Sequence, residues 1–213
     1  MADTSISTSH RSPTRREVLK KGAVGGALLW SAPAILTLSR AGAQQGTPCP
    51  GCTNSAFGLR LNTDTFGEGG CVQDVTAGGV GATVVCGNTG APCSASASIA
   101  TFSADIPGVI TGSASAITSS AQAPCDCATG PTGSASVADL SVTVGGTTET
   151  ASGSLPCNTV LIDELGVVVV LNEQTCDGDV LTVNAVHITG PSLDLILAQS
   201  RAGVAGCACT ACA

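Results

Sequence analysis

The chain has few of the side chains with which proteins bind nucleic acids or catalyse reactions. Beyond residue 43 it contains no Lys, Tyr, Trp or Met, and its basic groups are Arg60, Arg201 and the single histidine His187. Thirteen acidic residues against two arginines give this part a formal charge of −11. Nucleic-acid binding depends on Lys and Arg that displace counterions from phosphates. The composition therefore excludes nucleic acid as a partner and, for the same reason, an anionic membrane surface.

The N-terminal 43 residues hold the other basic side chains and resemble an export signal. The segment "TRREVLK", with Arg15 and Arg16, resembles the twin-arginine signal, and an apolar run follows over residues 22–38. Ala41-Gly42-Ala43 fits the pattern of a cleavage site. We therefore expect residues 1–43 to be a signal helix that is cleaved after Ala43, and residues 44–213 to form one secreted domain. An uncleaved membrane anchor and ordinary Sec export remain alternatives.

Cysteine is abundant in the part that would be exported. With only three aromatic residues after residue 43, the core must be built from Val, Leu, Ile and Ala, which bury little area each. An even number of cysteines in an exported domain predicts a disulfide framework, in which each bridge contributes about 2–4 kcal/mol. All twelve cysteines follow Ala43: Cys49, Cys52, Cys71, Cys86, Cys93, Cys125, Cys127, Cys157, Cys176, Cys207, Cys209 and Cys212.

Alternation of apolar and polar residues, with turn residues between, predicts an all-β fold. Residues 137–144, "VADLSVTV", alternate with period two, and residues 166–172, "GVVVVLN", form a continuous apolar run typical of a buried strand. In "DVLTVNAVHI", continued alternation places His187 in phase with Leu181 and Val183. About nine short strands of this kind predict a disulfide-rich antiparallel sandwich or barrel-like domain.

Two hairpins predict disulfide partners. In "CNTVLIDELGVVVVLNEQTC" a turn at residues 163–166 brings Cys157 nearly opposite Cys176. In "CVQDVTAGGVGATVVC" a turn at Gly78-Gly79 brings Cys71 opposite Cys86. The short loop between Cys86 and Cys93 offers a competing partner for Cys86, and the sequence leaves both pairings open.

Five thiols at the two chain ends offer a different chemistry from disulfides. Four sulfurs in tetrahedral geometry can hold zinc or an iron–sulfur cluster. An exported metalloprotein is therefore the alternative to the disulfide interpretation, although an oxidising compartment favours disulfides. Its ligands would come from Cys49, Cys52, Cys207, Cys209 and Cys212.

Three further patterns each have a structural and a functional interpretation. His187 is the one histidine that a catalytic triad could use, but "GPSLD" departs from the G-x-S-x-G elbow at its last position. Asp177-Gly178-Asp179 fits a turn better than a calcium site. Asn172-Glu173-Gln174 fits loop-fixing hydrogen bonds better than a ligand contact. We therefore expect no catalytic residues, and no cofactor or metal outside the thiolate alternative.

Residues 110–206 also resemble a known family. Their most specific pieces are Leu171-Asn172-Glu173-Gln174 and residues 182–187, "TVNAVH". In this order they resemble the choice-of-anchor P family of secreted and surface proteins of Gram-positive actinobacteria. The chain departs from that family at its end, "CACTACA", which carries no sorting motif. The resemblance implies a secreted or surface module and carries no agreed activity. We therefore expect a structural or binding module of the cell surface or medium, without catalytic activity. The sequence does not identify its partner, for which the cell wall or the extracellular space is the expected place.

Overall fold

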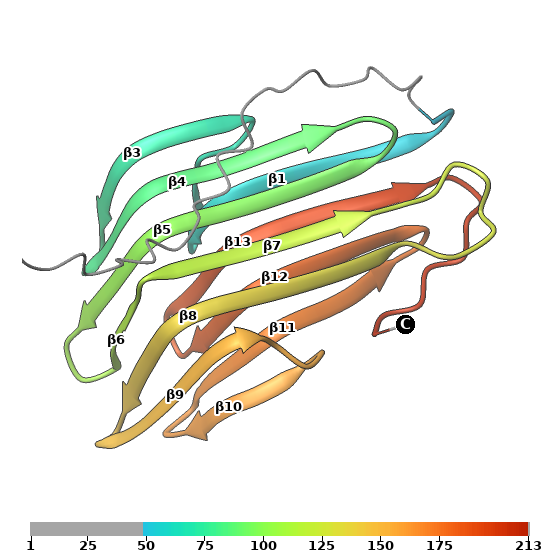
Figure 1. The fold of residues 1–213 in the computed structure, drawn as a ribbon. Helices are drawn as coiled ribbons and strands as arrows, with labels where there is room; N and C mark the ends of the chain where they lie inside the picture. The colour runs from blue at the N-terminus through green and yellow to red at the C-terminus, as the bar shows by residue number, and fades with distance from the viewer. Residues whose placement is uncertain (1–48, 213) are drawn as a thin grey trace, which may run out of the picture. The chain divides into compact units, whose positions relative to one another are not determined.

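The structure is a computed structural model that describes residues 49–212, so the expected signal and its cleavage site lie outside the described residues. Within this range the chain forms thirteen strands and no helix, arranged as two antiparallel sheets that face each other (Figure 1). The all-β expectation is confirmed. No helix of the described residues is long and apolar enough to cross a membrane.

Sheet A is the layer that lies behind in Figure 1. Three of its four central strands follow one another in the chain. The fourth, β1, comes from the N-terminal end of the described residues and pairs with β13. In spatial order the strands are β10 (Thr159–Glu164), β11 (Val167–Asp177), β12 (Val180–Gly190), β13 (Leu193–Val204), β1 (Cys52–Leu61) and β2 (Asp64–Phe66).

Sheet B is the front layer in Figure 1. Strands β6 and β7 are consecutive in the chain, and each pairs with β5 on one side and with β8 on the other. The strands are β3 (Gly70–Ala77), β4 (Val80–Gly90), β5 (Ser94–Ile106), β6 (Ile110–Ala114), β7 (Ala116–Gln122), β8 (Thr132–Val144) and β9 (Thr147–Ser154).

The core between the sheets consists mainly of aliphatic side chains, as the composition predicts. Leu59, Ile99 and Leu195 are among its fully buried members, and each such side chain stabilises the fold by roughly 1.5–3 kcal/mol. A polar contact also joins the sheets inside the core, a 2.6 Å hydrogen bond between the buried hydroxyls of Ser119 in β7 and Ser200 in β13. It satisfies both hydroxyls and joins the two sheets.

The two sheets come close together where β1 meets β4. A Cβ atom on Gly87 would stand 2.4 Å from the carbonyl oxygen of Ala56 and 2.5 Å from that of Gly67. A Cβ atom on Gly58 would stand 2.3 Å from the side chain of Val85 and 2.9 Å from the backbone nitrogen of Cys86. Glycine is required here because the backbone of one sheet lies where a side chain of the other would stand.

A transverse irregularity, which we call the crease, crosses four strands of sheet A at one level. It consists of a row of four residues that have no partner on the neighbouring strands, although the residues before and after each of them are paired. These residues are Gly58, Ala198, Ala185 and Asn172. Asn172 and Ala198 have φ angles of 46° and 53°. At the crease each strand reverses which residues face the core: in β13 Leu195 and Leu197 face inward on one side, and Ser200 and Ala202 on the other.

The crease overturns one sequence expectation. In β12 the inward residues are Leu181 and Val183 before the crease, and Val186 and Ile188 after it. His187 therefore faces outward, and its expected phase with Leu181 and Val183 is wrong. One irregular residue in a strand shifts all following side chains to the opposite face, so the alternation of inward and outward residues changes phase there.

The disulfide predictions had opposite outcomes. Cys71 is bonded to Cys86, and Gly78 and Gly79 form the predicted turn with φ angles of 56° and 84°. The competing pairing of Cys86 with Cys93 is thereby wrong.

The predicted bridge between Cys157 and Cys176 is wrong, because Cys157 bonds to Cys212 and Cys176 to Cys209. The hairpin itself forms, with a turn at Leu165 and Gly166. However, Thr159 lies opposite Leu171. Extending that register brings Cys157 opposite Glu173, three residues short of Cys176.

Candidate functional site

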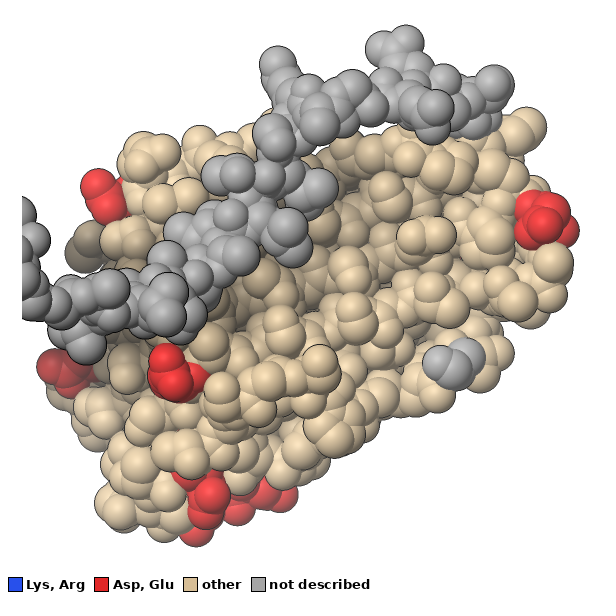
Figure 2. Space-filling view, viewed as in Figure 1, with Lys and Arg blue, Asp and Glu red and all other residues tan. Residues whose placement is uncertain are grey.

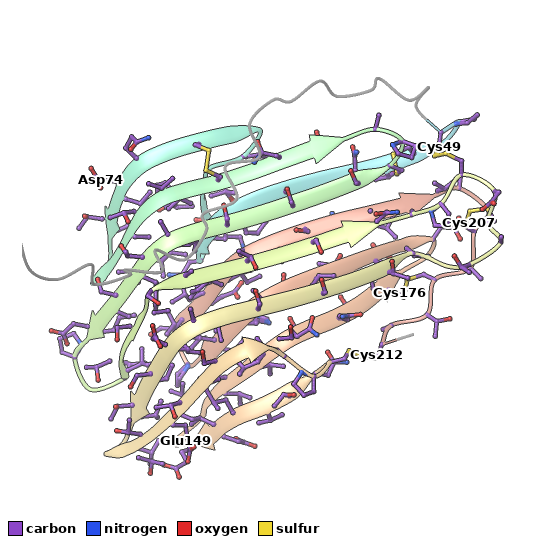
Figure 3. The ribbon with its side chains drawn as sticks, in the orientation of Figure 1. Cys49, Asp74, Glu149, Cys176, Cys207 and Cys212 are labelled. Atoms are coloured by element: carbon purple, nitrogen blue, oxygen red, sulfur yellow. A yellow bond between two sulfur atoms is a disulfide. The ribbon has the colours of Figure 1, made fainter. Side chains whose placement is uncertain are left out.

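Five of the six disulfides gather at one end of the sandwich, where Figure 3 labels Cys49, Cys207, Cys176 and Cys212. Three of these bridges hold the C-terminal tail, residues 205–212, to three separate segments. The pairs at this end are Cys49–Cys125, Cys52–Cys93, Cys127–Cys207, Cys157–Cys212 and Cys176–Cys209. The tail thereby covers the end of the sandwich that the strands leave open.

This pairing removes the basis for the thiolate alternative. Each of the five sulfurs proposed as metal ligands is bonded to a cysteine outside that set, so they are not gathered into one group. Among residues 49–212 no free cysteine remains, and no cluster of His, Cys, Asp and Glu is arranged to hold a metal ion. A bonded sulfur cannot serve as a thiolate ligand.

A connected group of charged side chains lies on the outer face of sheet A. His187 in β12 stands between two carboxylates, with Nδ1 2.7 Å from Oε2 of Glu173 in β11 and Nε2 3.0 Å from Oδ1 of Asp194 in β13. The side chains of His187 and Glu173 are 19% and 24% exposed, so water only partly screens their attraction. Asp194 is the more exposed partner.

Neighbouring side chains extend this group to a fourth strand. Arg60 of β1 donates to Oδ2 of Asp194 at 2.9 Å and lies over the ring of Phe57, 5.8 Å from its centroid. On the other side, Asn184 donates to Glu173 at 2.6 Å and accepts a 2.7 Å hydrogen bond from Gln199. We call the connected set Glu173, His187, Asp194 and Arg60 the charged chain.

The hydrogen bond between His187 and Glu173 shifts the pKa values of these two groups in opposite directions. The hydrogen bond to Glu173 raises the pKa of His187 above 6.5, with further contributions from both carboxylate charges that outweigh its burial. The hydrogen bond from His187 lowers the pKa of Glu173 below 4.5, against the opposing effect of burial. Each partner therefore favours the charged form of the other.

The contacts of His187 differ from those in a hydrolase triad. A general base needs a free ring nitrogen within reach of a nucleophile or substrate. Both nitrogens of His187 contact carboxylates, and within residues 49–212 no serine hydroxyl bonds to it. The arrangement thus lacks the histidine-to-serine contact of a hydrolase triad.

The segment Asn172-Glu173-Gln174 is divided between the two faces of sheet A. Asn172 and Gln174 are buried and donate to the carbonyl oxygens of Leu155 and Gly133 at 2.8 and 3.1 Å. Asn172 thus fixes loop backbone at Leu155, as the structural interpretation predicted, whereas Gln174 bonds to β8 of sheet B. Glu173 points the other way, into the charged chain.

Asp177-Gly178-Asp179 is the turn between β11 and β12, as expected, with Gly178 at a φ angle of 59°. Oδ2 of Asp179 accepts a 2.8 Å hydrogen bond from the backbone N–H of Gly206. The turn therefore helps to hold the start of the C-terminal tail.

The outer face of sheet B is dominated by small hydroxyl side chains. Figure 2 views this face, with acidic side chains along its margins and no Lys or Arg in sight. Hydroxyls on neighbouring strands bond to each other, as between Thr118 and Ser136 at 2.7 Å and between Ser120 and Ser134 at 3.0 Å. Such pairs stabilise the sheet and leave a mostly neutral, hydrated surface.

Neither a family model, a curated protein nor a solved structure matches the chain. The resemblance of residues 110–206 to the choice-of-anchor P family therefore stays a prediction.

The charged chain was missed from the sequence because its four members come from four strands. One signal was present: in β12 the buried apolar residues change from odd positions, ending at Ala185, to even positions, beginning at Val186. That change implies an outward His187, but the identity of its neighbours requires the order of the strands.

Proposed function

We propose that the chain is an exported structural or binding module that acts at the cell surface or in the medium, without catalytic activity. The observation that carries this proposal is the disulfide framework, in which all twelve cysteines form six bridges. Structural disulfides persist in oxidising compartments and are rare in the cytosol. Six bridges in one domain fit a protein that must stay folded without cellular repair.

The side chains outside the bridges support a non-catalytic role. The one histidine of the described residues is held on both sides by carboxylates. The hydroxyl face of sheet B suits a neutral, hydrated partner, such as a polysaccharide of the cell wall, better than a charged one. The likeness to the choice-of-anchor P family points to the same setting, the surface of a Gram-positive actinobacterium.

Twin-arginine export imposes a condition on how the domain folds. That route carries folded proteins, and thiols stay reduced in the cytoplasm. The sandwich must then form first and bring its cysteines together before they are oxidised. The core provides for this, because its aliphatic residues lie between the sheets and five bridges lie at one end.

Replacing Arg15 and Arg16 together with lysine tests the export route. We expect the variant to accumulate in the cytoplasm as a precursor with free thiols, whereas the wild-type chain reaches the medium or the wall fraction. The only tryptophan is Trp30, in the expected signal, so the exported wild-type chain should lack tryptophan fluorescence. Normal secretion of the double variant would contradict twin-arginine export, and tryptophan fluorescence from the exported chain would show that the signal is retained.

A further inference from the structure

The charged chain lies across the crease of sheet A, where regular backbone pairing is interrupted. On one side of the crease stands the outward row Glu173, Asn184, Gln199 and Phe57, and on the other the row His187, Ile196 and Arg60. The bond between Glu173 and His187 joins the two rows, and so does the contact of Arg60 with Phe57. Side chains thus link the two halves of the sheet across the level where regular pairing between the strands is interrupted.

The geometry at His187 requires a particular protonation state. Neutral imidazole has one N–H and one lone pair, whereas the imidazolium ion has two N–H groups. Both ring nitrogens of His187 lie within hydrogen-bonding distance of a carboxylate oxygen, at 2.7 and 3.0 Å. Carboxylates only accept, so both bonds exist together only when His187 carries two protons.

We propose that protonated His187 is an acid-dependent clamp: it holds Glu173 and Asp194 together across the crease, and sheet A loosens there when the ring loses a proton.

The charged groups around His187 support this role. Glu173 reaches it from β11, Asp194 from β13, and Arg60 of β1 binds the far oxygen of Asp194. Arg201, also on the outer face of β13, bonds instead to the hydroxyl of Thr182. With His187 protonated the charged chain has two positive and two negative members. When His187 loses a proton, one of its two carboxylate partners faces the lone pair of a ring nitrogen instead of an N–H group. The four side chains of the charged chain then carry a net charge of −1.

The direction of the pH effect follows from the two shifted groups. Because folding raises the pKa of His187, the protonated ring contributes its full stabilisation of the fold below pH 6.5. This stabilisation is lost as the pH rises through the pKa of His187 in the folded state. Because folding lowers the pKa of Glu173, its ionised carboxylate stabilises the fold fully above pH 4.5. This stabilisation is lost as the pH falls through the pKa of Glu173 in the folded state. The clamp is therefore complete between about pH 4.5 and 6.5 and opens first on the alkaline side.

An NMR titration of the secreted wild-type domain tests the protonation state directly. His187 is the only histidine after residue 43, so its ring signals need no assignment. We expect two ring N–H protons at pH 6 and a midpoint above 6.5, which Glu173→Gln should lower. In the control variant Asp139→Asn, which removes a carboxylate bonded to Ser115 in sheet B, the midpoint should not move. A midpoint at or below 6.5 in the wild type would overturn the clamp.

Urea unfolding between pH 5.5 and 9, with the disulfides intact, tests its effect on stability. In the wild type the unfolding equilibrium constant should rise above pH 6.5, by about tenfold for each unit that separates the folded and unfolded midpoints of His187. His187→Gln should remove this dependence, while Asp139→Asn should keep it. An equal dependence in His187→Gln would overturn the proposal, and if that variant does not fold, the wild-type titration decides.

Discussion

Alanine at position 87 is expected to destabilise the domain by about 3 kcal/mol or more. The new Cβ atom would lie 2.4 and 2.5 Å from two backbone oxygens, those of Ala56 and Gly67. Backbone cannot move aside as the end of a flexible side chain can, so β1 and β4 must separate. Urea unfolding of Gly87→Ala against the wild type measures the loss.

Gly70→Ala is the matched control for this substitution. Gly70 lies directly opposite Gly87 in the pairing of β3 with β4, and a Cβ atom there would meet nothing within 4 Å. The control should change the free energy of unfolding by less than about 0.5 kcal/mol. Equal stability of the two variants would mean that β1 and β4 do not approach as closely as described.

Removing the bridge between Cys127 and Cys207 should destabilise the domain by about 4 kcal/mol. The bridge joins residues 80 apart in sequence, and chain-entropy arguments give larger effects for longer loops. It also holds the C-terminal tail to the loop between β7 and β8. The double variant Cys127→Ala, Cys207→Ala should unfold at lower urea concentration and show faster hydrogen exchange in residues 205–212.

The bridge between Cys71 and Cys86 provides the comparison, because it closes a loop of only 15 residues between paired strands. Its removal should destabilise the domain by about 3 kcal/mol and leave exchange in the tail unchanged. If the variant without Cys71–Cys86 were less stable than the variant without Cys127–Cys207, the bridges to the C-terminal tail would not be the ones that stabilise the domain most.

Local features of the fold were predictable because they depend on neighbours in sequence. Alternation gave the strands of the sandwich, and Gly78-Gly79 gave the turn that places Cys71 opposite Cys86. The turn before Val167 and the turn at Gly178 were also expected and are present. In each case a few adjacent residues determine the conformation.

Features that depend on distant segments were not predictable. Cys157 and Cys176 both bond to the C-terminal tail, whose path across the end of the sandwich follows from how the two sheets stack. The outward face of His187 follows from the crease, which reverses the alternation that places a residue inside or outside. The charged chain depends on both, since its members meet only when four strands are in order.

Mass spectrometry of the secreted chain, intact and after digestion without reduction, tests the central claim that an exported domain is locked by this framework. We expect the mass of residues 44–213 less two hydrogens for each of six bridges. The disulfide-linked peptides should pair the tail cysteines 207, 209 and 212 with cysteines 127, 176 and 157 respectively. Free thiols, or a tail bonded within itself, would contradict the account.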